Sequence, residues 1–421
     1  MRNTDYFKKK KITIIGIARS GISCANLLHS LGAFVKISDA KDSSQNREVA
    51  GKLILKGIQA EIGKHSPGFI KGADLVVISP GVPLDALPVK WANESGIPVI
   101  GEIEVASMLC PASIIAVTGS NGKTTVTTLI GKIIASSGRN VFVCGNIGNP
   151  FCAEVEKIGE NDFVVLEVSS FQLETIKNFK PKIAVILNLT PNHLDRYNNM
   201  KEYCDAKKRI ALNQDDNDFL VLNGNDPLLK EIGKEVKSEV VFFNSGDGLN
   251  PNQSTVLSVG KILGIKEEII FKVFDEFKGI EHRMEYVREL SGVRFINDSK
   301  ATTADSAIWA IKNIETPIIL IAGGRHKGID YRVIVEAARN KLKGAILIGE
   351  AKEKIGSALK NEFKTEEALT LEEAVTKAYQ SASFGDSVLF SPMCSSFDMF
   401  KDYEDRGRVF KKIVLGLSEK K

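Results

Sequence analysis

The chain has 421 residues, 43% of them hydrophobic and 26% charged, which is enough for two to four domains of ordinary globular composition. Its 56 basic and 52 acidic residues are spread along the sequence and leave a net charge of +4, which argues against a dedicated nucleic-acid surface. No run of about 18 apolar residues exists and residues 1–11 lack an apolar core, so neither a membrane span nor a secretory signal is expected.

The N-terminal run Lys8–Lys11 directly precedes an apolar segment. It is interpreted as the solvated start of a strand rather than as a nucleic-acid or membrane patch, so neither kind of partner is predicted. The cysteines lack C-x-x-C spacing, which indicates reduced thiols and a cytoplasmic protein. They are Cys24, Cys110, Cys144, Cys152, Cys204 and Cys394.

Short apolar strands alternate with helical patterns in three segments, which is typical of parallel sheets covered by helices on both faces. The first segment begins with the strand KITIIGI, the helix ISCANLLHSLG and the strand FVKIS. The second opens at SIIAVTG and the third near GIEHRMEYV. We therefore predict an α/β protein of three domains: a Rossmann-like domain at 1–111, a P-loop ATPase-like domain with a mainly parallel sheet at 112–282, and a Rossmann-like domain at 283–421.

A glycine-rich loop joins a strand to a helix in the stretch AVTGSNGKTT, residues 116–125. Val117 stands where the P-loop formula has its first glycine, but the other parts are present. Glycines let backbone N–H groups approach phosphate, Lys123 adds a point charge and Thr124 can ligate Mg²⁺. We expect this loop to bind the phosphates of ATP through Gly119, Ser120, Asn121, Gly122, Lys123, Thr124 and Thr125.

Two further polar side chains follow apolar strands of the second segment. Glu167 ends the strand VVLE and His193 lies after AVILNLT, at the strand ends where open α/β sheets bind ligands. Both are candidate metal ligands, although a capping carboxylate and a loop histidine bonded to backbone would look the same. In the helical stretch YCDAKKRI, the pattern alone predicts that Lys207, Lys208 and Arg209 are solvated.

The motifs GSNGKTT, CGNIGNP, LEVSSFQLE, LNLTPNHLDRY and DAKKRI follow in the order and approximate spacing of the Mur ligases, which are similar to folylpolyglutamate synthases. SPGVP, GIEHRMEYV, NDSKATT and SPMCSSFDMFKDYEDRG resemble the branch of that family that adds D-glutamate to UDP-N-acetylmuramoyl-L-alanine. The resemblance covers nearly the whole chain. It implies a cytoplasmic, monomeric enzyme of peptidoglycan precursor synthesis that acts on small molecules and uses ATP with Mg²⁺, or Mn²⁺ in its place, to form an acyl phosphate.

The resemblance also implies roles for individual residues. Lys123, His193 and Lys207 are expected to be catalytic, and Thr124, Glu167, His193 and Lys207 to lie at the metal ions. The lysine that matches Lys207 is carbamylated in the family, which would turn a cation into a carboxylate-like group. An unmodified amine must be neutral to react with CO₂, so the resemblance implies a Lys207 that is neutral before it is carbamylated.

The first segment carries a degraded dinucleotide fingerprint, Gly16-x-Ala18-x-x-Gly21, with Asp39 at the end of the next strand. Taken alone it would suit NAD, whereas the resemblance implies the uridine nucleotide of the substrate. Plain turn chemistry is an alternative for Pro80 and Gly81. The expected substrate contacts are Arg19, Ser20, Asp39, Ser79, Pro80, Gly81, Asn146 and Ser169.

The third segment should bind the incoming amino acid, because D-glutamate carries two carboxylates that need lysine and hydroxyl donors. The residues implied are Lys300, Thr302, Lys327, Ser396 and Tyr403, with Tyr403 where the family often has phenylalanine. Asn252, Arg283 and Asp298 are implied at the nucleotide. The usual G-x-H-N is replaced by GLNPNQ, so only Asn252 matches there.

Three alternatives remain open. The chain could be another Mur or folylpolyglutamate-type ligase with a different amino acid, although no D-N-P-R stretch is present. It could be a nucleotide switch without enzymatic activity, which would have no need for the third-segment lysines. A hydride-transfer enzyme would leave the phosphate loop unexplained.

Overall fold

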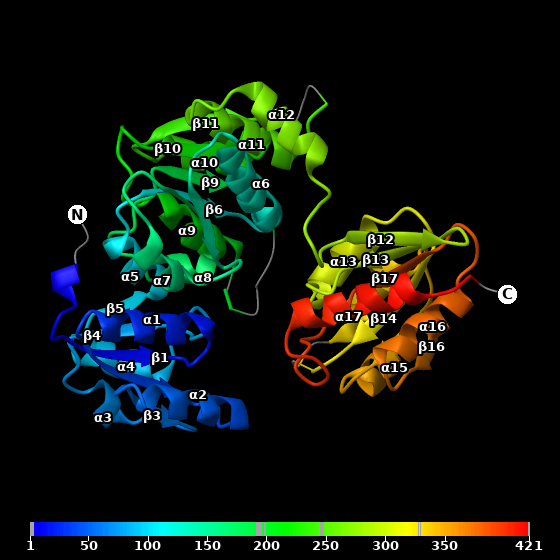
Figure 1. Cartoon of the computed structure of the whole chain (residues 1–421), viewed down its shortest axis with the longest axis horizontal. Helices are drawn as coiled ribbons and strands as arrows, with labels where there is room; N and C mark the ends of the chain where they lie inside the picture. Colours follow the sequence, from blue (N-terminus) through cyan, green and yellow to red (C-terminus); the bar gives the residue numbers. More distant parts are fainter. Residues whose placement is uncertain are drawn as a thin grey trace. The chain divides into compact units, whose positions relative to one another are not determined.

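The computed structural model describes residues 4–190, 196–197, 199–244, 248–326, 328 and 330–419. The chain divides into two compact units, Met1–Phe277 and Lys278–Lys421. The first unit contains two sheets and the second contains one (Figure 1). Among the described residues no helix is both long and apolar enough to cross a membrane.

The first sheet is entirely parallel, with strand order β3-β2-β1-β4-β5. Helices α1 and α2 pack on the face that carries Ile12 and Ile14, and α3 and α4 pack on the face that carries Ile15. The elements are η1 Thr4–Tyr6, β1 Lys11–Ile15, α1 Arg19–Ser30, β2 Phe34–Asp39, α2 Ser44–Ile54, β3 Gln59–Ile62, α3 Pro67–Ile70, β4 Leu75–Ile78, α4 Leu87–Glu94, β5 Val99–Gly101 and α5 Glu102–Leu109.

The second sheet is also parallel, in the order β11-β10-β9-β6-β8-β7. Helices α6, α11 and α12 cover one face of it. The elements are β6 Ser113–Thr118, α6 Lys123–Ser136, β7 Val141–Gly145, α7 Phe151–Glu154, η2 Val155–Lys157, β8 Phe163–Glu167, α8 Ser170–Leu173, β9 Ile183–Ile186, α9 Met200–Lys208, η3 Arg209–Ala211, β10 Phe219–Asn223, α10 Pro227–Lys234, β11 Glu239–Phe243, α11 Pro251–Ile262 and α12 Glu267–Glu276.

The two sheets of the first unit share one continuous apolar core, which includes Ile12 and Leu28 from the first sheet layer and Ala116 and Leu166 from the second sheet. Helix α5 connects the two layers and is held by its acidic residues. Glu104 is fully buried and accepts hydrogen bonds from the backbone N–H groups of residues 177, 178 and 179 at 2.7–3.0 Å. Because a buried carboxylate needs several donors, these bonds fasten α5 to the second layer.

Glu102 makes a second, weaker attachment at the start of α5. Its Oε1 accepts the backbone N–H of Cys152 at 2.5 Å, while its Oε2 is buried without a partner among the described residues. Burial raises the pKa of this carboxyl to about 7. Glu102 therefore sits in the junction as a group that titrates near neutral pH.

The second unit has one sheet in the order β12-β13-β17-β14-β15-β16, in which β12 alone is antiparallel to its neighbour. Helices α13, α14 and α15 pack on one face, and α16 and α17 pack on the other. The elements are β12 Glu285–Leu290, β13 Val293–Asn297, α13 Ala304–Lys312, β14 Ile318–Gly323, η4 Tyr331–Ile334, α14 Val335–Ala338, β15 Leu342–Ile348, α15 Lys352–Leu359, β16 Lys364–Glu367, α16 Leu371–Ser381, β17 Ser387–Phe390 and α17 Tyr403–Gly416.

The structure agrees with the predicted α/β class and with sheets that are mainly parallel. The predicted domain limits at 111/112 and 282/283 fall in the chain between successive sheets, and the three-domain division remains a proposal. The sequence pattern did not predict β3, β11 or β16. These three are edge strands, where one side is solvated and the apolar alternation is correspondingly weak.

Candidate active site

The phosphate loop runs from the end of β6 to the start of α6 and depends on two glycines in the left-handed region. Gly119 has φ 150° and Gly122 has φ 83°. A Cβ at Gly119 would lie 2.9 Å from the Cβ of Leu187, and one at Gly122 would lie 2.6 Å from Oδ1 of Asn252. Helix α6 starts without a side-chain cap, which leaves its N-terminal N–H groups for an anion. Asn252, predicted at the nucleotide, therefore borders the loop.

Asn188, which was not predicted, braces this loop from the segment after β9. Its carbonyl oxygen accepts the N–H of Ser120 at 3.0 Å, and its Oδ1 accepts the N–H of Asn121 at 2.9 Å. Its Nδ2 also donates to the carbonyl oxygen of Asn121 at 3.1 Å. A polar residue two positions after a buried strand is the signal that could have identified it.

Two lysine side chains share one acceptor in the loop. Nζ of Lys123 donates to the carbonyl oxygens of Gly119 and Ser120 at 2.8 and 3.0 Å. Nζ of Lys207 donates to the same Gly119 oxygen at 3.0 Å. Burial, and then the charge of Lys123, hold the pKa of Lys207 well below its usual range. The surroundings of Lys207 therefore disfavour its protonated form.

The solvated position that the helical pattern predicts for Lys207 is wrong, because its side chain is only 2% exposed. It lies on the buried face of α9 and its continuation, four residues after Tyr203 and three before Ile210. The Tyr203 hydroxyl lies 3.1 Å from Oγ of Ser120, and its ring centroid lies 4.7 Å from Nζ of Lys207. The apolar residues spaced one helical turn before and after Lys207 are the signal that its side chain is buried.

Glu167 ends β8 with its carboxylate buried next to the predicted residue Asn146. Nδ2 of Asn146 donates to Oε1 at 2.8 Å, whereas Oε2 has no hydrogen-bond partner among the described residues. The charge of Glu167 acts against the other effects on Lys207 and raises its pKa. A buried carboxylate oxygen left open near the phosphate loop fits a divalent cation, and the hydroxyl of the buried Thr124 at the start of α6 is a second suitable oxygen. His193 lies outside the described residues.

The first sheet offers a second cradle at its carboxyl end. A Cβ on Gly16, which has φ 99°, would meet Oγ of Ser79 at 2.8 Å, and one on Gly21 would meet the Gly16 oxygen at 2.0 Å. Helix α1 begins at Arg19 without a side-chain cap. Asp39 accepts the N–H groups of Ile17 and Lys41, each at 2.8 Å, and so fixes the turn. This is the close strand-to-helix packing that nucleotide-binding βαβ units use.

Two arginines connect this cradle to loops of the second sheet. Arg19 donates to the carbonyl oxygen of Gly148 at 2.8 Å, two residues after Asn146. Arg196 donates to the carbonyl oxygens of Pro80 and Val82 at 3.2 and 3.4 Å and pairs with Glu174 at 3.1 Å. Arg19 thus bonds the start of α1 to the loop after Asn146, and Arg196 bonds the segment after β9 to the loop at Pro80.

Four other residues of the first unit were predicted to contact substrate or ATP: Ser20, Gly81, Thr125 and Ser169. Ser20 is half-buried in the first turn of α1, and Gly81 is exposed. Thr125 lies within the first turn of α6. Ser169 caps α8: its hydroxyl accepts the N–H of Gln172 at 3.3 Å and donates to that side chain at 3.0 Å. The structure therefore shows a helix-capping role for Ser169, and its substrate contact stays a prediction.

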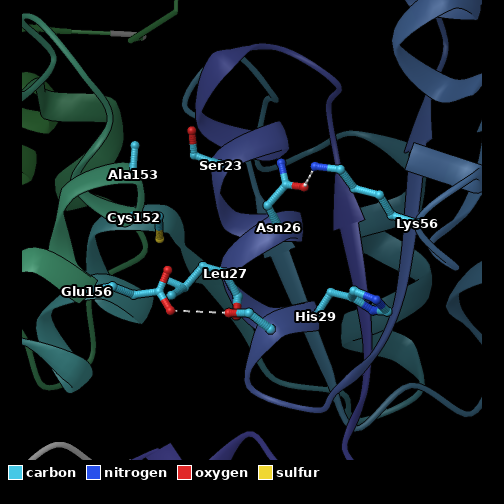
Figure 2. Close-up of a pocket in the computed structure, with 9 residues that line it drawn as sticks. Ser23, Asn26, Leu27, His29, Lys56, Cys152, Ala153 and Glu156 are labelled. Atoms are coloured by element: carbon cyan, nitrogen blue, oxygen red, sulfur yellow. Dashed lines mark hydrogen bonds between the residues drawn. The ribbon is translucent and has the colours of Figure 1, made fainter. Parts of the chain in front are cut away.

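A separate hollow of about 620 Å³ lies between α1 and the α7–η2 segment, away from these residues (Figure 2). Asn26 and Lys56 bond at 2.8 Å on one wall, and Ser30 donates to Glu156 at 3.3 Å across it. Cys152 borders it. None of its lining residues was a predicted site residue.

In the second unit, Asp298 follows β13 and is buried. Oγ of Ser391 donates to its carboxylate at 2.9 Å and the N–H of Met284 donates at 3.2 Å. Burial raises the pKa of Asp298 to about 7, against the opposing charge of Arg283. The two residues predicted at the nucleotide in this unit therefore interact with each other.

The predicted amino-acid residues of this unit gather around the start of α17. Lys300 donates its N–H to the His282 oxygen at 3.0 Å, and its Nζ lies 5.9 Å from the ring centroid of Tyr403. Thr302, two residues after Lys300, is half-buried, and Ser396 is buried on the neighbouring loop. Tyr403 starts α17, and its hydroxyl donates to Glu404 at 3.0 Å. Lys327 lies outside the described residues.

Arg406 was not predicted, yet it fixes both loops that carry these residues. It is 1% exposed and donates to Oγ and O of Ser299 at 3.0 and 2.8 Å, and to the Cys394 oxygen at 3.1 Å. Burial lowers the pKa of this guanidinium to about 10. The spacing of Arg406, Phe410 and Val414 on one helix face is the signal that it points inward.

Comparison with known proteins identifies the family. Three family models match in order: "Mur ligase MurD-like, N-terminal domain" at residues 10–101, "Mur ligase middle domain" at 117–270 and "Mur ligase, glutamate ligase domain" at 282–394. A UDP-N-acetylmuramoylalanine–D-glutamate ligase from Thermoanaerobacter sp. is 42% identical over 97% of this chain and 99% of its own length. The chain belongs to the Mur ligase family.

Other relatives of this Mur ligase agree. The UDP-N-acetylmuramoylalanine–D-glutamate ligase of Pelotomaculum thermopropionicum is 41% identical over 98% of this chain and 99% of the relative. Among solved structures, the UDP-N-acetylmuramate-alanine ligase MurC of Thermotoga maritima has a TM-score of 0.57 at 19% identity, covering 96% of this chain and 99% of that one. MurF of the same organism, solved with ADP, has a TM-score of 0.56 at 17% identity, covering 99% and 97%. These two structures show the shared Mur ligase fold.

Proposed function

We propose that this Mur ligase uses ATP to join D-glutamate to UDP-N-acetylmuramoyl-L-alanine in peptidoglycan precursor synthesis. The observation that carries this assignment is the 42% identity, over 97% of the chain, to a ligase named for that reaction. The substrates are small molecules, and ATP is one of them. We further propose a monomer in the cytoplasm.

The chemical problem is that a carboxylate must meet a triphosphate, so the site must supply positive charge. When bound, ATP with Mg²⁺ supplies the phosphoryl group that turns the acceptor carboxylate into an acyl phosphate. The chain provides the cradle of Gly119 and Gly122, whose conformation leaves room for phosphate oxygens. The ammonium of Lys123 donates to two carbonyl oxygens of the loop. When ATP binds, it would donate to the phosphate oxygens instead and so supply a point charge there.

The open carboxylate oxygen of Glu167 and the hydroxyl of Thr124 would hold the metal, together with His193 by the resemblance. Asn146 orients Glu167 by its 2.8 Å bond. Asn252 would border the nucleotide because its Oδ1 lies against the phosphate loop. His193 and Lys207 complete the proposed catalytic set with Lys123.

The uridine diphosphate would lie on the open start of α1, where Arg19 and Ser20 stand, against the wall of Ser79, Pro80 and Gly81. Asn146 and Ser169 would contact the same substrate from the second layer. In the second unit, Lys300, Thr302, Lys327, Ser396 and Tyr403 would hold the D-glutamate carboxylates. Arg283 and Asp298 would contact ATP. The amine of D-glutamate then attacks the acyl phosphate and phosphate leaves.

Lys207 is proposed to be carbamylated. Its buried amine forms an N–C bond to CO₂ and releases one proton to water, which leaves a carboxylate in place of a cation. The depressed pKa of Lys207 supports the neutral amine that this reaction needs, and the change removes its repulsion with Lys123. With ¹³C-labelled bicarbonate, a carbamate resonance is expected in the native chain and not in Lys207→Ala. A native chain without that resonance, active and unaffected by bicarbonate, would exclude the modification.

The function is tested by phosphate release from ATP with UDP-N-acetylmuramoyl-L-alanine and a panel of D- and L-amino acids. Release with D-glutamate alone supports the assignment, whereas release with another amino acid identifies a different ligase of the family. Oxygen labelled in the acceptor carboxylate should appear in the phosphate, because the acyl phosphate bridges the two. Unlabelled phosphate would rule out that intermediate.

A further inference from the structure

A cavity of about 390 Å³ lies at the amino ends of the first sheet, the edge opposite the nucleotide cradle. Its floor is made by residues on one sheet face that pair across the ladder: Lys11 with Phe34, and Thr13 with Lys36. Phe69 of α3 forms a wall, and Oγ1 of Thr13 donates to the Phe69 oxygen at 2.6 Å. The cavity is therefore part of the rigid sheet.

The fold explains why this part of the sheet is open. On this face α3 and α4 pack over β4, β5 and the Ile15 end of β1. Over β2 and β3, Phe69 of α3 lies against Lys36, whose Nζ is 5.4 Å from the Phe69 ring centroid, and further contacts lie at the carboxyl ends, where His65 bonds to Ser38 and Ser66 bonds to Glu61. At the start of β2, the side chain of Phe34 is consequently 64% exposed.

Positive charge is concentrated at this edge. Residues 4–11, 31–36, 55–58 and 71–74, which lead into or begin β1 to β4, contain seven lysines and two aspartates, a net charge of +5. No carboxylate oxygen of the described residues lies within 4.0 Å of any of these seven ammonium groups, which are Lys8, Lys9, Lys10, Lys11, Lys36, Lys56 and Lys71. Of the two acids, Asp74 already accepts the N–H of Lys11 at 2.8 Å.

Large apolar side chains protrude among these lysines. Leu55 is 89% exposed in the turn before β3, two residues from Gly57 of the cavity wall, and Phe34 projects from the start of β2. Ile54 is 54% exposed beside Leu55. Protruding apolar groups within a basic field are the two signals that together bind a protein to an anionic membrane surface. A nucleic-acid site would use the charge but would leave Leu55 without a role.

We propose that this amino-end surface, defined by the seven lysines with Phe34, Ile54 and Leu55, docks on membranes that contain anionic phospholipids. The lysines attract the headgroup phosphates, and the cavity between Phe34 and Phe69 receives one headgroup. Phe34 and Leu55 insert at the acyl boundary. This peripheral contact needs no spanning helix, and it differs from the prediction that Lys8–Lys11 is a solvated strand start without a membrane partner.

The test is co-sedimentation of the full chain with vesicles of phosphatidylcholine plus phosphatidylglycerol and with vesicles of phosphatidylcholine alone. Binding to the anionic vesicles should be at least about tenfold tighter and should weaken steeply with added salt. Equal binding to both vesicles, or no binding to either, would refute the proposal. Displacement by free inorganic phosphate alone would indicate a small-anion site instead of a membrane surface, and tighter binding to RNA would indicate a nucleic-acid surface.

Two double variants separate charge from insertion. Lys9→Glu with Lys71→Glu, and Phe34→Ser with Leu55→Ser, should each weaken binding about tenfold or more. Their matched controls lie in the second unit: Lys354→Glu with Lys360→Glu, both exposed, and Leu369→Ser with Phe384→Ser, which are 77% and 88% exposed. Controls that bind as weakly as the test variants would contradict a defined surface. Ligase activity on soluble substrate should stay unchanged in all four, which shows that each has folded.

Discussion

Lys123 and Lys207 donate to the same carbonyl oxygen, that of Gly119, at 2.8 and 3.0 Å. Two ammonium groups so close, one of them buried, would repel each other strongly. A neutral Lys207 amine would relieve this repulsion, in line with its lowered pKa. The position of Lys207 is therefore arranged for an amine rather than for an ammonium.

The first prediction concerns that amine. Lys207→Ala should lower the ligase kcat by about 100-fold or more, because it removes the group that completes the charge of the site. The neighbouring Lys208→Ala is the control, since Lys208 pairs with Glu235 at the surface, and it should change kcat by less than about twofold. Steady-state phosphate release measures both. Equal activity of the two variants would remove Lys207 from the mechanism.

The second prediction uses two glycines of identical φ that flank α6, Gly122 before it and Gly138 after it. Gly122 and Gly138 both have φ 83°, so alanine strains the backbone equally at both. Only at Gly122 would the new Cβ meet a neighbour, Oδ1 of Asn252 at 2.6 Å, whereas nothing lies within 4 Å at Gly138. Gly122→Ala should raise the KM for ATP about tenfold or more, while Gly138→Ala should cost only about 1 kcal/mol of stability. Matched KM values would show that the loop does not hold ATP.

The third prediction concerns the metal. Glu167→Gln should raise the Mg²⁺ concentration needed for half-maximal activity by about 10–100-fold, because it removes the charge from the open Oε2. The folded chain should not be destabilised by much, since that oxygen has no hydrogen-bond partner to lose. Glu156→Gln, in the hollow of Figure 2, is the surface control. An unchanged Mg²⁺ requirement would place the metal elsewhere.

The fourth prediction concerns stability against pH. The folded pKa of Glu102 is raised from 4.5 to about 7, so the folded chain retains a proton that the unfolded chain releases. Its contribution to stability is present below pH 4.5 and is lost as pH rises to about 7, by about 3 kcal/mol in total. Urea unfolding of Glu102→Gln should lose this difference between acid and about pH 8.

Glu104→Gln is the matched control for that measurement. Its carboxylate accepts three backbone N–H groups, and an amide would turn two of its own donors toward them. It should destabilise the chain at every pH, by about 2 kcal/mol or more. If Glu102→Gln behaves in the same way, Glu102 is ionised in the folded chain and the argument from burial fails.

Much of this molecule could be predicted from its sequence. The strand, glycine-rich loop and Lys-Thr of residues 113–125 are contiguous, so their local chemistry determines the phosphate cradle. The strand ends at Asp39 and Glu167 could be located for the same reason. Contacts between distant segments were harder to predict, because the approach of Asn252 to Gly122 and of Arg196 to Pro80 depends on the tertiary packing.

The residues that the sequence pattern was least able to predict were buried polar ones. Arg406 and Lys207 carry the residue types of a solvated surface, and each is identified as buried only when its apolar neighbours one turn away are considered. Glu102 and Glu104 were missed because a carboxylate that satisfies backbone N–H groups has no sequence signature. Asn188 was missed because its brace on the phosphate loop exists only after β6 and β9 pair.

The shared core under α5 has a consequence for recombination between related genes. Exchanging the first sheet at residue 111 would place foreign side chains against Leu166 and would pair the backbone N–H donors that now bond to Glu104 with a helix from another parent. A crossover at residue 277 cuts where the two compact units meet in sequence and leaves each core whole. Viable chimaeras should therefore inherit their first 277 residues from one parent.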